Sequence, residues 1–299
     1  MQGGFRAERQ EHDAGDGNPD RDHSPLSLSA GVLKRLGEQH SATLNVGRYQ
    51  RAPAAEELYS FGPHEATQTF ERGDLDLDEE TALNVDIGLR RDRGRLRWSA
   101  NAFYTQYEDF VVLRSVDEGL NADGSGTPVA DGMADRVNEE GEFEVDGELL
   151  LQDYGAFDAT FYGAEAEISF DLLTAPHRLT ATLQGDYVRG ELDDENEDLP
   201  RITPGRYGVG LAYEGSHWRA STNVLYVSEQ TRTAPLEDET DAFTDLTAFL
   251  GYRIPVGEES ALIYLRGENL LVEEIIRHSS FLRVAQPGRR LTTGVHAHF

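Results

Sequence analysis

The chain of 299 residues contains no cysteine, which excludes a disulfide framework, a thiolate nucleophile and a zinc site with cysteine ligands. Basic residues are also few: 27 Lys plus Arg stand against 55 Asp plus Glu, for a formal net charge of −28. This balance excludes a nucleic-acid-binding surface, which needs clustered positive charge. The acidic side chains must lie on solvated loops or meet cations.

Long hydrophobic runs are missing as well. No apolar stretch approaches the ~18 residues of a membrane-spanning helix. The N-terminus, MQGGFRAERQEHDAGDG, lacks the basic-then-apolar pattern of a secretory signal and reads like the inside of a β-strand. We therefore expect a fragment or a truncated product. Motifs of common enzymes are absent too: there is no Gly-x-Ser-x-Gly, no His-Glu-x-x-His and no glycine-rich phosphate loop.

Alternation of apolar and polar residues with a period of two runs through the whole chain and predicts about twelve strands, each near the ~9–11 residues that a tilted membrane strand needs. The expected strands are Gly3–Glu11, Leu26–Leu36, Ser41–Gln50, Ala82–Arg91, Arg95–Tyr107, Phe157–Leu172, His177–Arg189, Tyr207–Tyr213, Trp218–Ser228, Ala242–Ile254, Ala261–Asn269 and Arg290–Phe299.

The connections alternate strictly between short and long. The short ones are Gly37–His40, Asp92–Gly94, Leu173–Pro176, Glu214–His217 and Pro255–Ser260, and the long ones are His12–Pro25, Arg51–Thr81, Glu108–Ala156, Gly190–Arg206, Glu229–Asp241 and Leu270–Arg289. Short turns on one side and long loops on the other are typical of an up-and-down barrel in an outer membrane. A soluble sandwich with Greek-key crossings has no reason to sort its loops in this way. The sequence therefore predicts an all-β, antiparallel transmembrane β-barrel with long polar extracellular loops.

Aromatic residues near the strand ends support this fold. A half-buried soluble sheet also alternates, but its aromatics lie more often in the middle of strands. Here the expected interfacial girdles comprise Tyr104, Tyr107, Tyr187, Tyr213, Trp218, Tyr226 and Tyr252. The last expected strand alternates up to the C-terminal Phe299, with Val295 and Leu291 on the same face. This ending resembles the assembly signal that outer-membrane barrels present to the barrel-assembly machinery.

The segment Arg51–Arg90, RAPAAEELYSFGPHEATQTFERGDLDLDEETALNVDIGLR, resembles a segment of TonB-dependent outer-membrane receptors. The shared landmarks are Arg-Ala-Pro, Glu-Glu-Leu, Gly-Pro-His and an acidic Gly-Asp-x-x-Leu stretch. Ala52-Pro53 and the acids after it also predict a helical turn with Pro53 at its first position. Further landmarks follow in order at Glu108-Asp109-Phe110, Gly163-Ala164-Glu165 and Asn269-Leu270.

This resemblance implies a receptor that imports a scarce ligand, such as a metal or a metal complex, through a barrel of 22 strands that holds an N-terminal plug. The chain departs from that pattern because it has no plug and no TonB-contacting segment. We expect residues 1–299 to be the C-terminal part of the barrel, in the outer membrane of a Gram-negative bacterium with lipid and lipopolysaccharide around it. The TonB system would act only with the missing part. The strands would close alone, pair with that part or stay unfolded, because lipid does not tolerate unpaired edges.

Two landmarks, Gly62-Pro63-His64 and Ile276–Leu282, are similar to ones in the zinc-uptake branch of these receptors. Imidazole and carboxylate groups are zinc ligands, so His64 and His278 with Glu65 and Glu71 form a candidate metal set. Zinc or another divalent cation would then be transported, and no resident cofactor is expected. Alternatively, His64 caps a turn and His278 packs against a neighbouring loop.

Other charged groups have plainer interpretations. Asn121–Gly126 resembles part of a calcium loop, but Gly132 stands where the bidentate glutamate belongs. The acid clusters Asp193–Asp198 and Glu237–Asp241 indicate solvated loops. Inward-facing Arg97, Asp186, Arg266 and Glu268 could line a ligand path or stiffen the wall through salt bridges.

Two alternatives come from other classes. One is an outer-membrane protease or lipase built on a complete barrel of about twelve strands. The other is a soluble acidic β-protein that binds cations. Enzymatic activity that depends on single His or Asp residues would favour the first, and a folded, monodisperse species without detergent would favour the second.

Overall fold

A computed structural model describes the chain except for residues 16, 119–131, 145, 194–196, 258 and 299. Within this part of the chain, no helix has both the length and the apolar composition to cross a membrane.

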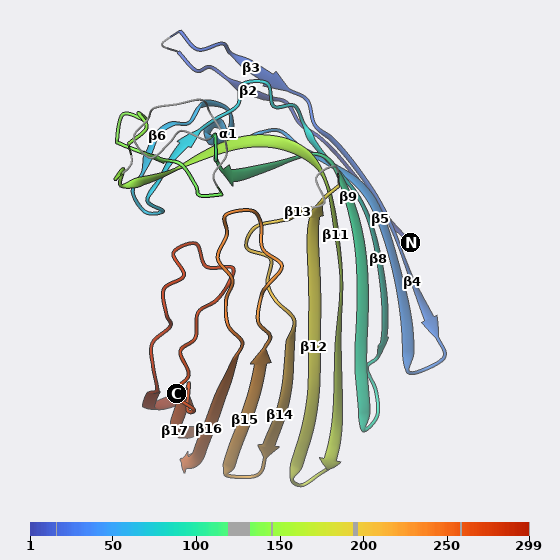
Figure 1. Cartoon of the computed structure of the whole chain (residues 1–299). Helices are drawn as coiled ribbons and strands as arrows, with labels where there is room; N and C mark the ends of the chain where they lie inside the picture. The colour runs from blue at the N-terminus through green and yellow to red at the C-terminus, as the bar shows by residue number, and fades with distance from the viewer. Residues whose placement is uncertain (16, 119–131, 145, 194–196, 258, 299) are drawn as a thin grey trace.

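Twelve strands form one continuous path in sequence order, and each pairs antiparallel with the next (Figure 1). They are β1 (Gln2–Ala7), β4 (Leu26–Leu36), β5 (His40–Arg51), β8 (Glu80–Arg91), β9 (Leu96–Ser115), β11 (Leu149–Leu173), β12 (Arg178–Leu192), β14 (Arg206–Glu214), β15 (Trp218–Val227), β16 (Phe243–Val256), β17 (Glu259–Glu268) and β18 (Arg290–His298). The expected number of strands is confirmed. Gly3–Glu11 is not one strand, because β1 ends at Ala7 and a separate two-stranded sheet follows, made of β2 (Gln10–His12) and β3 (Arg21–His23).

The sheet curls, with its first and last strands at opposite edges (Figure 1). Short turns join the strands at one end, and the long connections gather at the other, which confirms the predicted alternation. In the described residues β1 pairs only with β4 and β18 only with β17. The two strands are therefore the edges of the sheet.

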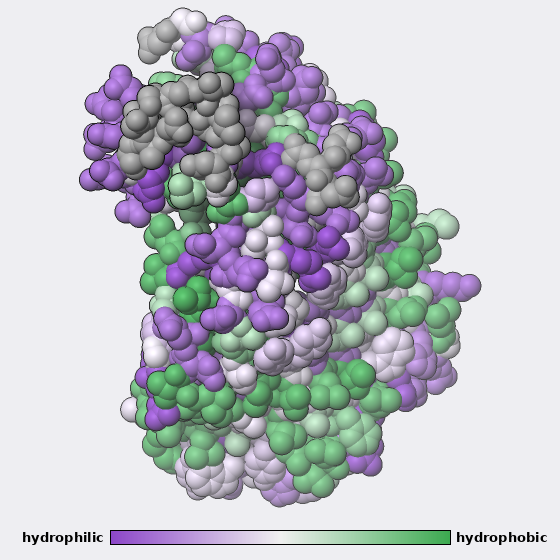
Figure 2. Space-filling view, in the orientation of Figure 1, coloured by the Kyte–Doolittle hydropathy of each residue, from purple (hydrophilic) through white to green (hydrophobic). Residues whose placement is uncertain are grey.

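Alternate residues give the sheet one apolar and one polar face. A row of directly paired residues shows the apolar face: Ile168, Leu183, Val209 and Val224 lie side by side on β11, β12, β14 and β15. Their exposed fractions are 46%, 54%, 54% and 39%. Large apolar side chains this exposed over a whole sheet are unusual for a protein surrounded by water. Figure 2 shows green apolar surface over the lower, strand-bearing part and purple polar surface above it.

The aromatic girdles form on this apolar face, with one correction. Tyr213, Trp218 and Tyr252 lie near the short turns, and Tyr104, Tyr187 and Tyr226 lie towards the long connections. Tyr107 does not belong to them. Its ring packs against Phe110 and Phe161, at centroid distances of 5.0 and 5.3 Å. It stands three positions after Tyr104, so the alternation of the strand turns it to the other face.

The connection Arg51–Thr81 is folded rather than loose. It contains α1 (Ala55–Tyr59), β6 (Phe61–His64) and β7 (Thr69–Arg72), and β7 pairs in parallel with Leu150–Asp153 of β11. The helix begins after Ala54, so Pro53 precedes it and is not its first residue as predicted. The acids of its first turn are where we expected them, and Glu57 accepts a hydrogen bond of 2.7 Å from the amide of Ala54.

The expected loop Glu108–Ala156 is also partly strand. β9 continues to Ser115 and β11 already begins at Leu149, and the short strand β10 (Arg136–Val137) pairs with β11. A further short strand, β13 (Glu197–Asp198), pairs antiparallel with the last residues of β12 at the same end of the sheet. We call α1, β6, β7, β10 and these extensions of β9 and β11 the cap. Its core contains Phe70, Val137, Leu149 and Leu151, with a second cluster of Leu58, Leu77 and Val111.

Candidate ligand-binding surfaces

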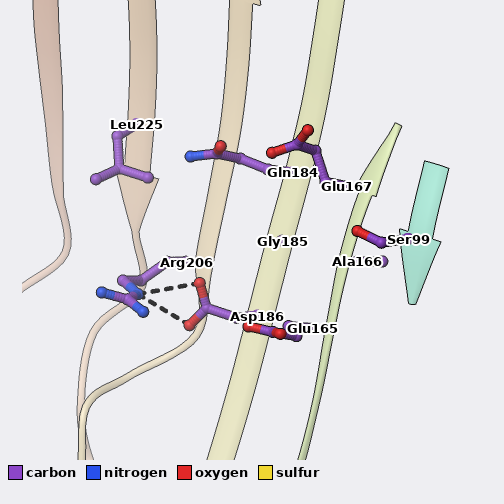
Figure 3. Close-up of a pocket in the computed structure, with 9 residues that line it drawn as sticks. All are labelled: Ser99, Glu165, Ala166, Glu167, Gln184, Gly185, Asp186, Arg206 and Leu225. Carbon is purple, nitrogen blue, oxygen red and sulfur yellow. Dashed lines mark hydrogen bonds and ion pairs between the residues drawn. The ribbon is translucent and has the colours of Figure 1, made fainter. Parts of the chain in front are cut away.

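The polar face carries a hollow of about 330 Å³ in the middle of the sheet (Figure 3). Glu165 and Glu167 of β11 lie beside Gln184 and Asp186 of β12, and Arg206 of β14 follows on the next strand. Arg206 Nε donates to Asp186 at 2.9 Å. Asn101 Nδ2 on β9 donates to Glu165 at 2.9 Å. Because three carboxylates and one guanidinium line this hollow, it favours binding of a cationic or hydrogen-bonding group.

Ion pairs stiffen the polar face nearer its ends. Arg97 forms a bidentate pair with Asp171 across β9 and β11, with distances of 2.7 and 2.9 Å. Glu268 pairs with Arg266 of its own strand, β17, and with Arg290 of the neighbouring β18. All four charges that we expected on this face are paired in this way, since Asp186 holds Arg206. Of the two roles considered for them, the geometry favours the structural one.

In the cap, His64 and Glu71 face each other because β6 and β7 form a hairpin. His64 Nδ1 lies 2.9 Å from Glu71 Oε1, and the hydroxyl of Thr69 donates to the same oxygen at 3.2 Å. The Tyr154 hydroxyl donates to the other oxygen of Glu71 at 3.4 Å. Burial, together with the nearby charge of Glu71, raises the pKa of Tyr154 to about 12. The Glu71 carboxylate is therefore buried and fixed by hydrogen bonds, while the His64 side chain is half exposed.

A larger hollow of about 740 Å³ lies beside this pair and includes both His64 and Glu71 in its lining. Its opposite side comes from other connections: Arg201 between β12 and β14, and Phe281 after β17. The Arg201 guanidinium lies over the Phe281 ring, 4.3 Å from its centre. The hollow thus combines an imidazole and a carboxylate on one side with a guanidinium and an aromatic ring on the other.

His278 belongs to a different cluster. Its side chain is 1% exposed, with Nε2 3.3 Å from Glu237 Oε1 and Nδ1 3.1 Å from Thr240 Oγ1. It therefore packs against a neighbouring loop, as the alternative interpretation proposed. The four residues of the candidate metal set do not meet: Glu65 is exposed in the β6–β7 turn, and only His64 and Glu71 touch. Among the described residues, no group of three or more His, Cys, Asp and Glu is arranged to hold a metal ion.

Glu237 was expected to be solvated, and this prediction is wrong. Its side chain is 10% exposed and accepts hydrogen bonds from the amides of Arg201 and Ala234, at 2.9 and 3.1 Å, and from the Arg283 guanidinium at 2.9 Å. Burial alone would raise the pKa of Glu237, but the contacts with His278 and with the two amides hold it below its ordinary value. Sequence reasoning missed this carboxylate because its partners come from two other long connections.

The other acid cluster is also partly paired. Glu197 forms an ion pair with Arg114, and Asp198 one with Arg189, at 2.5 and 3.2 Å. Residues 194–196, the calcium-like stretch Asn121–Gly126 and Phe299 of the expected assembly signal lie outside the described residues. Val295 and Leu291 lie on the apolar face of β18, paired with Ile263 and Gly267.

Comparisons with known proteins bear on this arrangement. A family profile described as TonB dependent receptor-like, beta-barrel, matches residues 1–270. Among solved structures, a copper transporter, OprC, has a TM-score of 0.73 at 20% identity over 98% of this chain and 44% of its own. The FrpB iron transporter of Neisseria meningitidis has a TM-score of 0.65 at 16% identity, over 98% of this chain and 42% of its own.

A mutant of the ferric enterobactin receptor PfeA from Pseudomonas aeruginosa, in complex with enterobactin, has a TM-score of 0.60 at 15% identity. The match covers 92% of this chain and 42% of the receptor. The chain thus spans less than half the length of these proteins, and the likenesses are to their fold. TonB-dependent receptor barrels are outer-membrane proteins and not enzymes, so the barrel hydrolase and the soluble cation-binding protein are both wrong. The chain belongs to the family of TonB-dependent receptor-like β-barrels.

Proposed function

We propose that this chain forms part of the wall of an outer-membrane receptor that takes up a scarce ligand, a metal ion or a metal complex, by TonB-dependent transport. The observation that carries the proposal is the division of the sheet into an exposed apolar face and a polar face. The apolar face suits lipid, and the polar face suits a solvated passage. The similar structures include a copper transporter, an iron transporter and a ferric enterobactin receptor.

The cap is the proposed place of ligand capture. The hollow beside it combines His64 and Glu71 of the cap with Arg201 and Phe281 of two other long connections. A cargo bound there would meet groups of both charges and an aromatic surface, which suits a metal complex with organic ligands better than a bare cation. The acidic hollow on the polar face lies farther along the sheet and would attract cationic groups.

A bare divalent cation remains a narrower proposal for the His64–Glu71 pair. Two protein ligands leave the remaining coordination positions to water or to cargo. Zinc titration of the chain by calorimetry tests it. We expect His64→Ala to weaken zinc binding by at least about tenfold, while His278→Ala, which removes a buried histidine from another cluster, leaves it unchanged. Equal zinc affinity in the wild-type chain and in His64→Ala would contradict this proposal.

The other partners follow from the proposed location. Lipid and lipopolysaccharide would surround the apolar face, and the barrel-assembly machinery would receive the last strand with Leu291, Val295 and Phe299. The TonB system would supply energy for uptake.

The uptake proposal is tested with the complete protein that carries this chain, produced in a Gram-negative host without its own copper and iron receptors. The probes are radioactive copper and ferric enterobactin labelled with radioactive iron. We expect the protein in the outer-membrane fraction and uptake of at least one probe above the vector control, lost when tonB is deleted. Outer-membrane protein without uptake of either probe, or uptake that survives the deletion, would contradict the proposal.

A further inference from the structure

The short-turn end of the sheet has a charge opposite to that of the rest of the chain. We define the short-turn rim as residues 34–42, 89–97, 170–180, 212–220 and 252–261, the five hairpin turns with their flanking strand ends. These segments contain ten Lys or Arg and six Asp or Glu, whereas the remainder contains seventeen and 49. A chain with a net charge of −28 therefore has a net basic rim.

Three histidines of the rim lie against aromatic residues of the apolar face. His40 lies 6.0 Å from the Trp98 ring, His177 stacks on Tyr213 at 5.9 Å, and His217 stacks on Tyr252 at 5.9 Å. The Tyr213 hydroxyl also makes a hydrogen bond of 2.8 Å with His177 Nδ1. All three histidines are exposed. The same pairing in three separate hairpins gives the rim a repeated unit with an apolar body and a polar edge.

The permanent charges beside these pairs face outward. Lys34 is paired with Ala42, and Arg91 with His40 and Trp98, which puts both on the apolar face. Arg93 lies in the turn between β8 and β9, and the Arg95 guanidinium lies over the Phe170 ring at 5.4 Å. In the described part of the chain, Lys34, Arg91 and Arg93 form no ion pair.

On the polar face of the same rim, two of the arginines form ion pairs with carboxylates of the chain. Arg97 pairs with Asp171, and Arg219 with Glu214 at 3.0 Å. Acidic residues are abundant in this chain, so outward-facing cations without a protein partner point to an anion supplied by the surroundings. An aromatic girdle alone would need no such charges.

We infer that the short-turn rim binds the phosphate groups of anionic glycerophospholipids in the leaflet on that side. Lys34, Arg91 and Arg93 would meet the phosphates at the level where Trp98, Tyr213 and Tyr252 meet the interface. Guanidinium and ammonium groups form short charge-assisted hydrogen bonds with phosphate, and long basic side chains reach headgroups while their stems lie along apolar surface. This inference rests on the membrane placement proposed above and concerns lipid binding rather than uptake.

The chain offers a built-in reporter, because its two tryptophans lie at the short-turn end of the sheet: Trp218 is in the rim, and Trp98 directly follows the rim segment 89–97. The protein is reconstituted in phosphatidylcholine vesicles that contain, at equal mole fraction, brominated phosphatidylglycerol or brominated phosphatidylcholine. Quenching of tryptophan fluorescence then measures which lipid occupies the positions next to the rim. We expect the anionic lipid to be preferred by roughly fivefold or more, since each basic side chain near an anionic surface contributes about that factor.

The variant with Lys34→Gln, Arg91→Gln and Arg93→Gln should lose this preference. Arg91→Lys with Arg93→Lys, which keeps the charges, should retain it, as should Arg48→Gln, which removes an outward-facing arginine at the other end of the same face. Equal quenching by the two lipids in the wild-type chain would overturn the inference. In a competition experiment, unbrominated lipid A or unbrominated phosphatidylglycerol is added to displace the brominated phosphatidylglycerol. If lipid A restored the fluorescence more strongly, the rim would bind lipopolysaccharide and the inference would be overturned as well.

The two proposals fail in different ways. If neither brominated lipid quenched the tryptophans, the rim would not contact a bilayer and the membrane placement itself would be wrong. Quenching by both lipids to the same extent would leave the placement standing and remove only the phosphate site.

Discussion

Replacing Glu237 by glutamine should loosen three of the long connections at once. The carboxylate lies between β15 and β16, accepts the Arg201 amide from the connection after β12, and pairs with Arg283 from the connection after β17. Glutamine keeps the shape but loses the charge. Its side-chain NH2 group would also face N–H donors that now bind the carboxylate, and two donors cannot bond to each other. Charge-assisted hydrogen bonds contribute about 1.5–3 kcal/mol each, and the amide oxygen of glutamine keeps some of this. We expect a loss of about 2–3 kcal/mol of local stability.

Hydrogen exchange with mass spectrometry measures this loss directly, because local opening controls the exchange of protected amides. The amides to follow are those of Arg201, Thr240 and Gln286, which are bonded to Glu237, Gln230 and Ile275. A loss of about 2–3 kcal/mol corresponds to exchange that is about 30- to 150-fold faster. Glu239→Gln is the matched control, since this nearby glutamate is exposed. Unchanged exchange at Gln286 in Glu237→Gln would refute the idea that one carboxylate ties these connections together.

The same carboxylate makes the connections sensitive to acid. Because the fold holds the pKa of Glu237 below its ordinary value of 4.5, its stabilisation is present above that value and is lost as the pH falls through the lowered pKa. After correction for intrinsic exchange rates, the wild-type amides should lose protection in this acidic range. Glu237→Gln should show no such step.

Further predictions concern the apolar face and the cap. Leu183→Arg places a charge in the middle of the apolar face and should cost about 2–4 kcal/mol in vesicle-based unfolding, whereas Thr182→Arg on the polar face should cost much less; equal costs would contradict the two-face assignment. In an alkaline absorbance titration, one tyrosine should ionise near 12 and disappear in Tyr154→Phe. Since its pKa is raised from 10.0, the stability that it contributes is present below that value and is lost as the pH rises towards 12. Arg72 binds both oxygens of Asp153 at 2.6 Å, and the pair is partly solvated. Arg72→Lys should therefore lower the free energy of local opening at the β7 amides by only about 0.5–1 kcal/mol and speed their exchange accordingly. Unchanged exchange would mean that water has replaced the pair.

The strands of the sheet could be predicted from sequence wherever one face is apolar and the other polar. Leu26–Leu36 agrees with β4 to the residue. The prediction failed where both faces are covered. Val111 packs under α1 with Leu58 and Leu77, while the next residue, Val112, packs on the other side with Leu192 and Leu199. Consecutive apolar residues then replace the alternation, and the period-two signal disappears.

The candidate site could be predicted from sequence only where its residues are close together along the chain. His64 and Glu71 are seven residues apart and meet through the β6–β7 hairpin, and the sequence names both. Their neighbours Tyr154, Arg201 and Phe281 come from distant connections, and no periodicity relates them. His278 was grouped with His64 by residue type alone. Chemical likeness carries no information about which long connections pack together.

The parallel pairing of β7 with β11 has a consequence for engineering. Residues Thr69–Arg72 of one long connection form a ladder with Leu150–Asp153 of another, and Phe70 is buried among Val137, Leu149 and Leu151 of the second. A chimaera that exchanges only the first connection for that of a relative would remove Phe70 from this apolar pocket and leave one edge of Leu150–Asp153 without its ladder partner. Specificity grafts in this barrel should therefore move Arg51–Thr81 and Glu108–Ala156 together, as a single module.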